Sequence, residues 1–260
     1  MHSAVVTGSA RGIGRGIAEL LVERGYAVVV TDLDGDAARR TAEEIGAAAG
    51  VAQDVRQEAS HAAVLAEAER HGELRVWVNN AGVGYDGTLQ SLTSEQVDAL
   101  VDVNLKGVLW GMRTAFGAFG AFGGVGGDVV NVASVSGLGP VPWLSAYAAT
   151  KAAVVSVSMS AHVETPKRVR VHALCPDGVD TAMVDAMQGR AKAIVHSGGR
   201  LLTVAEIARA AADLVGSRRV VRTVPAWRGG LVRGSQLLPS QTGGAFAVFE
   251  AVGRRVMRRR

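Results

Sequence analysis

Short apolar runs alternate with longer amphipathic stretches from the first residues to about residue 225. The run at 27–31 is Ala-Val-Val-Val-Thr, without polar alternation, as expected of a strand covered on both faces of a sheet. Stretches with helical spacing separate these runs. The pattern predicts strands at 3–7, 27–31, 49–53, 75–78, 128–134, 169–174 and 220–224. It predicts helices at 13–24, 34–45, 58–71, 95–116, 145–164 and 203–215.

This order of elements is typical of an α/β protein with a doubly wound parallel sheet of about seven strands and helices on both faces. A chain of 260 residues is long enough for one domain with a full core. We expect that domain over residues 1–225 and a basic amphipathic C-terminal extension of it over 226–260. After Pro225 the pattern changes to a Gly/Ser/Pro-rich loop. An amphipathic stretch follows, with Phe246, Phe249, Val252 and Val256 on one face.

Composition narrows the class of protein. Cys175 is the single cysteine, so an internal disulfide is excluded, and we expect a small buried side chain there. There is no apolar run of bilayer length, and the first predicted strand begins almost at Met1, which leaves no room for a signal peptide. We therefore expect a cytoplasmic protein, and no metal site.

The net charge of +4 conceals an uneven distribution. Residues 217–260 contain ten arginines against the single acid Glu250, a net +9, while the remainder of the chain is acidic. We first expect a solvated face on a helix that packs against its own domain or a partner subunit. Peripheral contact with an anionic membrane is the second interpretation. Nucleic-acid binding is not expected, because no base-reading motif accompanies the charge.

Two motifs indicate chemistry. Tyr147 and Lys151 are four positions apart in a predicted helix, so the phenol and the ammonium share one face. A nearby ammonium is expected to lower the pKa of the phenol, which suits proton exchange with an alcohol oxygen. The segment from Thr7 to Gly14 is a glycine-rich turn between the first strand and the first helix, where the backbone can approach a pyrophosphate. Together they predict hydride transfer from a dinucleotide.

In order and spacing, these and further motifs resemble the short-chain dehydrogenase/reductase family over residues 3 to about 225. The matching residues are Thr7, Gly8, Gly12, Gly14, Asp54, Val55, Asn79, Asn80, Ala81, Gly82, Asn104, Ser134, Tyr147, Lys151, Pro176 and Thr181. The resemblance implies a Rossmann-like fold and hydride transfer between a nicotinamide and an alcohol or carbonyl.

Asp32 bears on the choice of cofactor. It follows the second predicted strand, where a carboxylate can accept hydrogen bonds from both ribose hydroxyls of NAD. The same charge repels a 2′-phosphate by about 4 kcal/mol per unit charge pair at 4 Å. Arg11 pairs with that phosphate in some relatives, although Asp34 could give it another role here. NAD is therefore the first choice and NADP the alternative.

The remaining cofactor contacts are implied by the resemblance. Asp54 and Val55 flank the adenine, with Asp54 bonding its amino group, and Asn80 and Gly82 line the ribose, although Asn80 could equally be a structural turn residue. The full set of candidate cofactor residues is Gly8, Arg11, Gly12, Ile13, Gly14, Asp32, Asp54, Val55, Asn80, Gly82, Tyr147, Lys151, Val179 and Thr181.

The resemblance also implies four catalytic residues. Ser134 holds the substrate oxygen at Tyr147, the acid–base group, and Lys151 lowers the pKa of Tyr147 and holds the nicotinamide ribose. Asn104, in the middle of a predicted helix, binds a water that links Lys151 to solvent. Each of these residues alone has a structural alternative, such as a turn residue or a solvated charge. Their joint presence favours catalysis.

The substrate side departs from the family pattern at Asp177, where glycine is usual after proline. This side chain either tunes substrate choice or points to solvent. Residues 182–202 resemble the segment that closes over substrate. The candidate pocket walls, which suggest a hydrophobic substrate, are Tyr85, Leu138, Trp143, Met183 and Met187.

We therefore expect an NAD(H)-dependent oxidoreductase that interconverts a hydrophobic secondary alcohol and a ketone. The alternatives are an NADP(H)-dependent ketoreductase and a cofactor-sensing regulator or scaffold. The helices at 95–116 and 145–164 form a dimer contact in relatives, so a homodimer or homotetramer is expected. The Gly/Phe-rich segment at 117–127 has no functional assignment.

Overall fold

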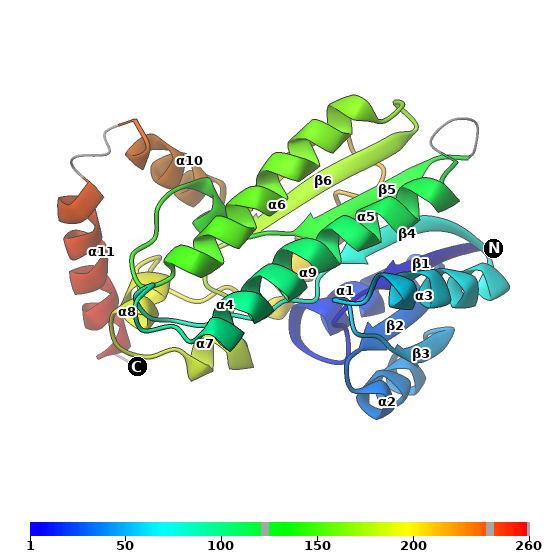
Figure 1. Cartoon of the computed structure of the whole chain (residues 1–260), viewed down its shortest axis with the longest axis horizontal. Helices are drawn as coiled ribbons and strands as arrows, with labels where there is room; N and C mark the ends of the chain where they lie inside the picture. Colours follow the sequence, from blue (N-terminus) through cyan, green and yellow to red (C-terminus); the bar gives the residue numbers. More distant parts are fainter. Residues whose placement is uncertain (121–124, 238–241, 259–260) are drawn as a thin grey trace.

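Seven parallel strands form one sheet in the order β3-β2-β1-β4-β5-β6-β7 (Figure 1). The structure is a computed structural model and describes residues 1–120, 125–237 and 242–258. The strands are β1 (His2–Val6), β2 (Ala27–Asp32), β3 (Ala49–Ala52), β4 (Glu73–Asn79), β5 (Gly127–Val132), β6 (Val169–Pro176) and β7 (Val221–Val224).

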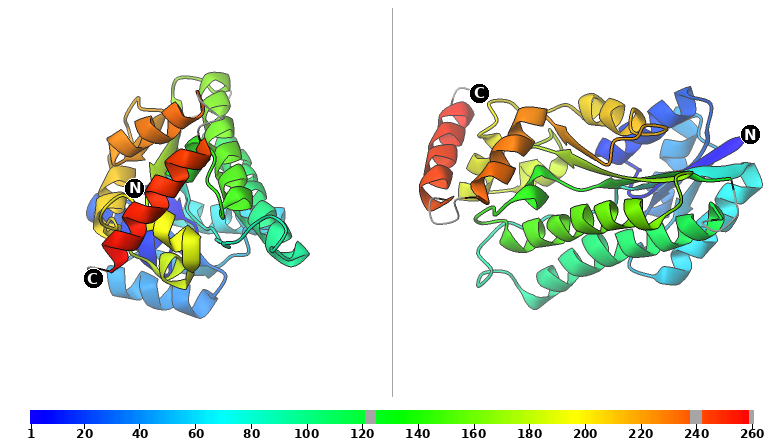
Figure 2. Two further views of the ribbon diagram at one scale, coloured as in Figure 1. Left: turned by 90° about the vertical axis from the view of Figure 1, so that its left-hand side faces the viewer. Right: turned by 90° about the horizontal axis from the view of Figure 1, so that it is seen from above.

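Helices cover both faces of the sheet (Figure 2). One face is covered by α1 (Gly12–Glu23), α2 (Gly35–Ile45) and α9 (Val204–Ala212). The other face is covered by α3 (Glu58–His71), α5 (Gly107–Ala118) and α6 (Ser145–Glu164). The doubly wound α/β fold expected from the sequence is confirmed.

The two cores explain why the strands lack polar alternation. Val5 and Trp77 point into the core beneath α3, α5 and α6, whereas their neighbours Val6 and Val78 point into the core beneath α1 and α9. All four side chains are at most 1% exposed. Because consecutive residues in a strand face opposite sides, a sheet covered on both sides needs apolar residues at every position.

The long helix expected at 95–116 is interrupted. It consists of α4 (Ser94–Val101), a π turn η1 (Asp102–Lys106) and α5. Asn104 lies in the π turn, and its side chain bonds to the backbone of Val83 instead of remaining on a regular helix surface. This long-range contact is invisible to helical periodicity.

The expected fifth strand is also shorter than predicted. β5 ends at Val132, and Ser134 lies beyond it as the N-cap of the short 3-10 helix η2 (Val135–Leu138). The Gly/Phe-rich segment at 117–127 begins in the last residues of α5; within it Phe119 is fully buried and packs closely against Gly127. Residues 121–124 of that segment lie outside the described residues.

The chain after β6 adds helices at one end of the molecule (Figures 1 and 2). They are α7 (Ala182–Ala186), α8 (Gly189–His196), α10 (Ala226–Ser235) and α11 (Thr242–Met257). The loop expected after Pro225 is in fact α10, whose buried face contacts β7 and η2. None of the described helices is long and apolar enough to cross a membrane.

The amphipathic face predicted for the extension is partly wrong. Phe246 is 7% exposed and packs with residues of α8, but Val252 is 42% exposed and faces outward. Gly253 sets this orientation, because it lies directly against the backbone of Ala193 in α8. Arg259 and Arg260 lie outside the described residues.

Candidate functional site

A cleft of about 920 Å³ lies at the carboxyl ends of the strands. Ser134, Tyr147 and Lys151 line it, and so do all but one of the candidate cofactor residues. Among the predicted catalytic and cofactor-binding residues, the two that do not line the cleft are Gly14 and Asn104.

The glycine loop forms one wall of the cleft. Gly8 and Gly12 adopt φ angles of +60° and +58°, which side chains other than glycine rarely adopt. A Cβ on Gly8 would lie 2.7 Å from the Cα of Ala81. Arg11 is the N-cap of α1 but provides no side-chain cap, so the first amide groups of α1 are left for another acceptor. This arrangement fits an anion such as a pyrophosphate.

Asn80 and Gly14 hold that loop in place. The Asn80 amide donates hydrogen bonds of 2.9 Å to the carbonyls of Thr7 and Gly8. A Cβ on Gly14 would overlap this amide and the Gly8 carbonyl. Gly14 does not line the cleft, and its lack of a side chain allows α1 to approach the loop; a direct contact of Gly14 with the cofactor stays a prediction.

Asp32 ends β2 at the edge of the cleft, where its Oδ2 accepts a hydrogen bond of 3.2 Å from Ala10 N. Asp34 accepts a hydrogen bond from Ala37 N and caps α2. Within the part of the chain that is described, no ion pair joins Asp34 to Arg11. Arg11 itself lines the cleft.

The carboxylate of Asp54 is held by Arg56. The Arg56 guanidinium donates to both carboxylate oxygens at 2.8–3.1 Å and keeps the pKa of Asp54 below its usual value. Arg56 also lines the cleft, a position that the sequence motifs gave no reason to expect.

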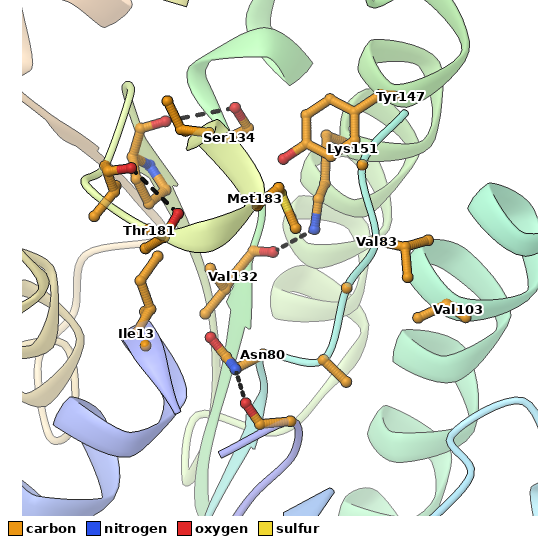
Figure 3. Close-up of a pocket in the computed structure, with 18 of the residues that line it drawn as sticks. Ile13, Asn80, Val83, Val103, Val132, Ser134, Tyr147, Lys151, Thr181 and Met183 are labelled. Carbon is orange, nitrogen blue, oxygen red and sulfur yellow. Dashed lines mark hydrogen bonds between the residues drawn. The ribbon is translucent and has the colours of Figure 1, made fainter. Parts of the chain in front are cut away.

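Ser134, Tyr147 and Lys151 meet at the other end of the cleft, with the Tyr147 hydroxyl pointing to the side where Ser134 lies (Figure 3). Ser134 accepts a hydrogen bond from Ser136 N at 3.1 Å and lies 3.5 Å from the Pro176 carbonyl. The Lys151 ammonium donates to the Val132 carbonyl at 2.9 Å and lies 5.8 Å from the centre of the Tyr147 ring. The last carbonyl of β5 therefore fixes the amine beside the phenol.

The pKa values of this pair differ from the sequence-based expectation. Burial raises the pKa of Tyr147 to about 12, against a smaller opposing effect of the Ser134 hydroxyl. Burial also lowers the pKa of Lys151 to about 8. The expected fall of the Tyr147 pKa is therefore not found in this arrangement, because removing the phenolate from water outweighs the other interactions of the phenol. The Tyr147 phenol is therefore neutral at neutral pH.

Asn104 acts on the cleft through Val83. Its Oδ1 accepts from Val83 N at 2.8 Å, and its Nδ2 donates to Val83 O at 2.9 Å. Nδ2 also lies 3.3 Å from Thr150 Oγ1. Because these contacts occupy its amide, the side chain fixes the loop that lines the cleft. Oδ1 accepts one hydrogen bond here and has a second lone pair, so the predicted water contact stays a prediction.

The substrate end of the cleft has apolar walls. Tyr85, Met183 and Met187 line it as expected, but Leu138 and Trp143 do not. Leu138 is a core residue, 4% exposed. Other apolar residues line the cleft for which no sequence motif gave a signal; they are Val83, Leu144, Val184 and Val195.

Asp177 is buried at the same end and does not point to solvent. Its side chain is 10% exposed and forms an ion pair with Arg228 of α10, with 3.0 Å between Oδ2 and Nε. Burial raises the pKa of Asp177, and the charge of Arg228 opposes that effect.

A family model described as short chain dehydrogenase matches residues 2–192. The chain belongs to the short-chain dehydrogenase family. It is an oxidoreductase that acts on CH–OH groups. A sorbitol dehydrogenase of Cereibacter sphaeroides is 39% identical to this dehydrogenase over 194 residues, which are 70% of this chain and 75% of the relative.

Solved structures resemble this dehydrogenase over most of its length. A 3-ketoacyl-(acyl-carrier-protein) reductase from Brucella melitensis, complexed with NADH, has a TM-score of 0.76 and 35% identity, covering 86% of this chain and 96% of that one. An actinorhodin polyketide ketoreductase variant with NADPH has a TM-score of 0.77 and 27% identity, covering 86% and 95%. The similar structures therefore include proteins with either nicotinamide dinucleotide.

Proposed function

We propose that this protein is an NAD(H)-dependent dehydrogenase that interconverts a hydrophobic secondary alcohol and its ketone. One observation carries the proposal: a single cleft holds both halves of the site. Ser134, Tyr147 and Lys151 lie at one end, and the uncapped N-terminus of α1 and Asp32 lie at the other.

The residues of the cleft fit a nicotinamide dinucleotide. The free amide groups at the start of α1 suit the pyrophosphate, and Gly8 and Gly12 place no side chain between the loop backbone and the cleft. Val179 and Thr181 also line the cleft. When bound, the dinucleotide supplies or accepts the hydride at the substrate carbon.

The side chains manage the proton. In the reductive direction Ser134 and Tyr147 hydrogen-bond the carbonyl oxygen, and Tyr147 donates its proton to that oxygen as negative charge develops there. A phenol with a pKa of about 12 is fully protonated at neutral pH and suits this role. Lys151 is mostly protonated below pH 8, so it stabilises the phenolate left behind.

Asp32 supports NAD over NADP. It is the acidic residue at the end of β2, and its carboxylate lines the cleft. A 2′-phosphate placed there would meet a like charge, whereas ribose hydroxyls would donate hydrogen bonds to it. Arg11 and Arg56 also line the cleft, and they are the reason to test NADPH in parallel.

The apolar walls support a hydrophobic substrate. Tyr85, Leu144, Met183 and Val195 are among the apolar residues that line the cleft, and the carboxylate of Asp177 is paired with Arg228. Such a pocket offers a polyol few partners for its hydroxyl groups.

The test is a panel of ketones and alcohols assayed at 340 nm with both dinucleotides. Tyr147→Phe removes the proton donor and keeps the ring, so we expect turnover to fall by a factor of about 100 to 10,000 while NADH still binds. Turnover that persists in Tyr147→Phe would refute this assignment. Product formation without a change in nicotinamide absorbance would indicate another reaction class. A protein that binds NADH but turns over no ketone would favour a cofactor-sensing role.

A further inference from the structure

The buried pair Asp177 and Arg228 joins parts of the chain that are distant in sequence. Asp177 follows β6 at the substrate end of the cleft, and its backbone N donates to Val224 O at 2.9 Å. Arg228 lies on α10, with its side chain 5% exposed. At 3.0 Å between Nε and Oδ2, the contact is a close approach of opposite charges, since the Nε geometry is not that of a hydrogen bond.

Arg228 contacts two further elements. Its guanidinium donates to the hydroxyl of Ser197, the residue that caps the C-terminus of α8. Its guanidinium carbon lies 4.9 Å from the centre of the Phe249 ring of α11. One buried side chain therefore connects the end of β6, the end of α8 and the terminal helix.

Helix α8 is packed tightly on both sides. A Cβ on Gly178, next to Asp177, would lie 2.5 Å from Val195 Cγ1 of α8. On the opposite side, Gly253 of α11 lies against the backbone of Ala193. Figure 2 shows α11 lying across α8 at this end of the molecule. Neither side leaves room for another atom, so the position of α8 depends on the contacts that hold its neighbours.

This position matters for the cleft, because Val195 of α8 and Met187 just before it line the substrate end. Met187 also belongs to the apolar cluster that contains Phe246 of α11. A shift of α8 would therefore move both wall residues, but it would leave Asp32 and the glycine loop unchanged.

Stability alone is a weak explanation for the pair, since the cost of removing two charges from water often exceeds their attraction. We propose that Asp177 and Arg228 are positioning residues for the substrate: the pair fixes α8 between β6 and α11 and so sets the apolar wall formed by Met187 and Val195. The proposal rests on the dehydrogenase function proposed above, and it assigns the C-terminal helices a role in substrate recognition.

The experiment measures KM and kcat of the full-length protein, using the ketone that the wild type reduces fastest, in Arg228→Met. We expect the ketone KM to rise about tenfold, the KM for NADH to stay within twofold, and amide hydrogen exchange over 189–196 to accelerate. Arg233→Met is the matched control, because Arg233 is an exposed arginine on the same helix. It should leave all three quantities unchanged.

The double variant Asp177→Asn/Arg228→Met separates positioning from charge neutralisation. Arg228→Met leaves Asp177 as an unpaired buried charge and should lower the thermal midpoint. The double variant contains no such charge, so its thermal midpoint should recover while the ketone KM stays raised. Recovery of the wild-type ketone KM in the double variant would overturn the proposal. Ser197→Ala keeps the ion pair of Asp177 and Arg228 and removes the hydrogen bond from Arg228 to the end of α8. We expect a threefold rise in the ketone KM. If Arg228→Met does not fold, Ser197→Ala tests the proposal in its place.

The outcome is distinguishable from failure of the proposed function. If the wild type reduces no ketone, the dehydrogenase assignment fails, and hydrogen exchange over 189–196 in the same variants still tests the contact. If the wild type is active and Arg228→Met changes neither the ketone KM nor the exchange of α8, the positioning role is refuted and the dehydrogenase assignment stands.

Discussion

Replacing Lys151 by methionine should stabilise the protein while removing its activity. Lys151 is 4% exposed, and burial lowers the pKa of its amine to about 8. One pKa unit corresponds to about 1.4 kcal/mol, so keeping the charge in the folded protein at pH 7 costs about 3 kcal/mol. Losing the hydrogen bond to Val132 O offsets about 1 kcal/mol of that gain. The net expectation is about 2 kcal/mol of stabilisation, or about 6 °C in thermal midpoint.

The stability gained in Lys151→Met should depend on pH. The folded pKa of Lys151 is lowered, so the penalty is fully present below pH 8 and fades as pH rises toward 10.5, the ordinary value of the unfolded chain. At pH 10 about 1 kcal/mol remains, and the advantage of Lys151→Met should nearly vanish. Titration of Tyr147 and Cys175 occurs in both proteins and largely cancels in the comparison.

The measurement is thermal unfolding of wild type and Lys151→Met at pH 7 and pH 10, together with ketone reduction at pH 7. Activity should fall at least about a hundredfold. Lys106→Met is the control, since Lys106 is a half-exposed lysine paired with Asp102 at 2.7 Å, and it should change stability by less than about 0.5 kcal/mol. A Lys151→Met protein that is less stable than wild type by the same amount at both pH values would refute the reasoning.

Two other substitutions test the cofactor end and the terminal helix. Asp32→Ala should raise the ratio of kcat/KM for NADPH to that for NADH by about tenfold or more, because one charge repulsion is removed; an unchanged ratio would assign cofactor choice to other residues. Gly253→Ala places a Cβ against the backbone of Ala193 and should lower stability by about 1–3 kcal/mol in thermal unfolding. Gly230→Ala in α10, with no atom within 4 Å of the new Cβ, should instead be neutral or stabilising by up to about 1 kcal/mol. Equal effects of the two glycine substitutions would contradict the close packing of α11 on α8.

Much of the fold could be predicted because the parallel strands are apolar at every position. The run at 27–31 indicated burial on both faces, and Val28, Val29 and Val30 are fully buried. Helix α6 could be placed because its pattern is long and continuous. The interruption of the helix at Asn104 could not be predicted: the side chain bonds twice to Val83, 21 residues away, and a local pattern does not contain that contact.

The chemistry of the site was only partly accessible from the sequence. The spacing of Tyr147 and Lys151 predicted that they share a helix face, and both line the cleft. Their pKa values were not accessible, because burial of both groups determines them. Arg228 was counted among the solvated arginines of the extension. Its burial against Asp177 depends on how α10 packs, and a charge count carries no information on that packing.

The π turn at Asp102–Lys106 also constrains how this protein can be altered. A π turn contains roughly one residue more than an α turn, so α5 is rotated by about 100° relative to a continuation of α4. Deleting one residue here would remove that rotation and produce a continuous α-helix. The side chains of α4 would then point in directions that no longer match those of α5. The faces that α4 and α5 present to their neighbours could not both be kept, so this short stretch should tolerate exchange of residues far better than any change in their number.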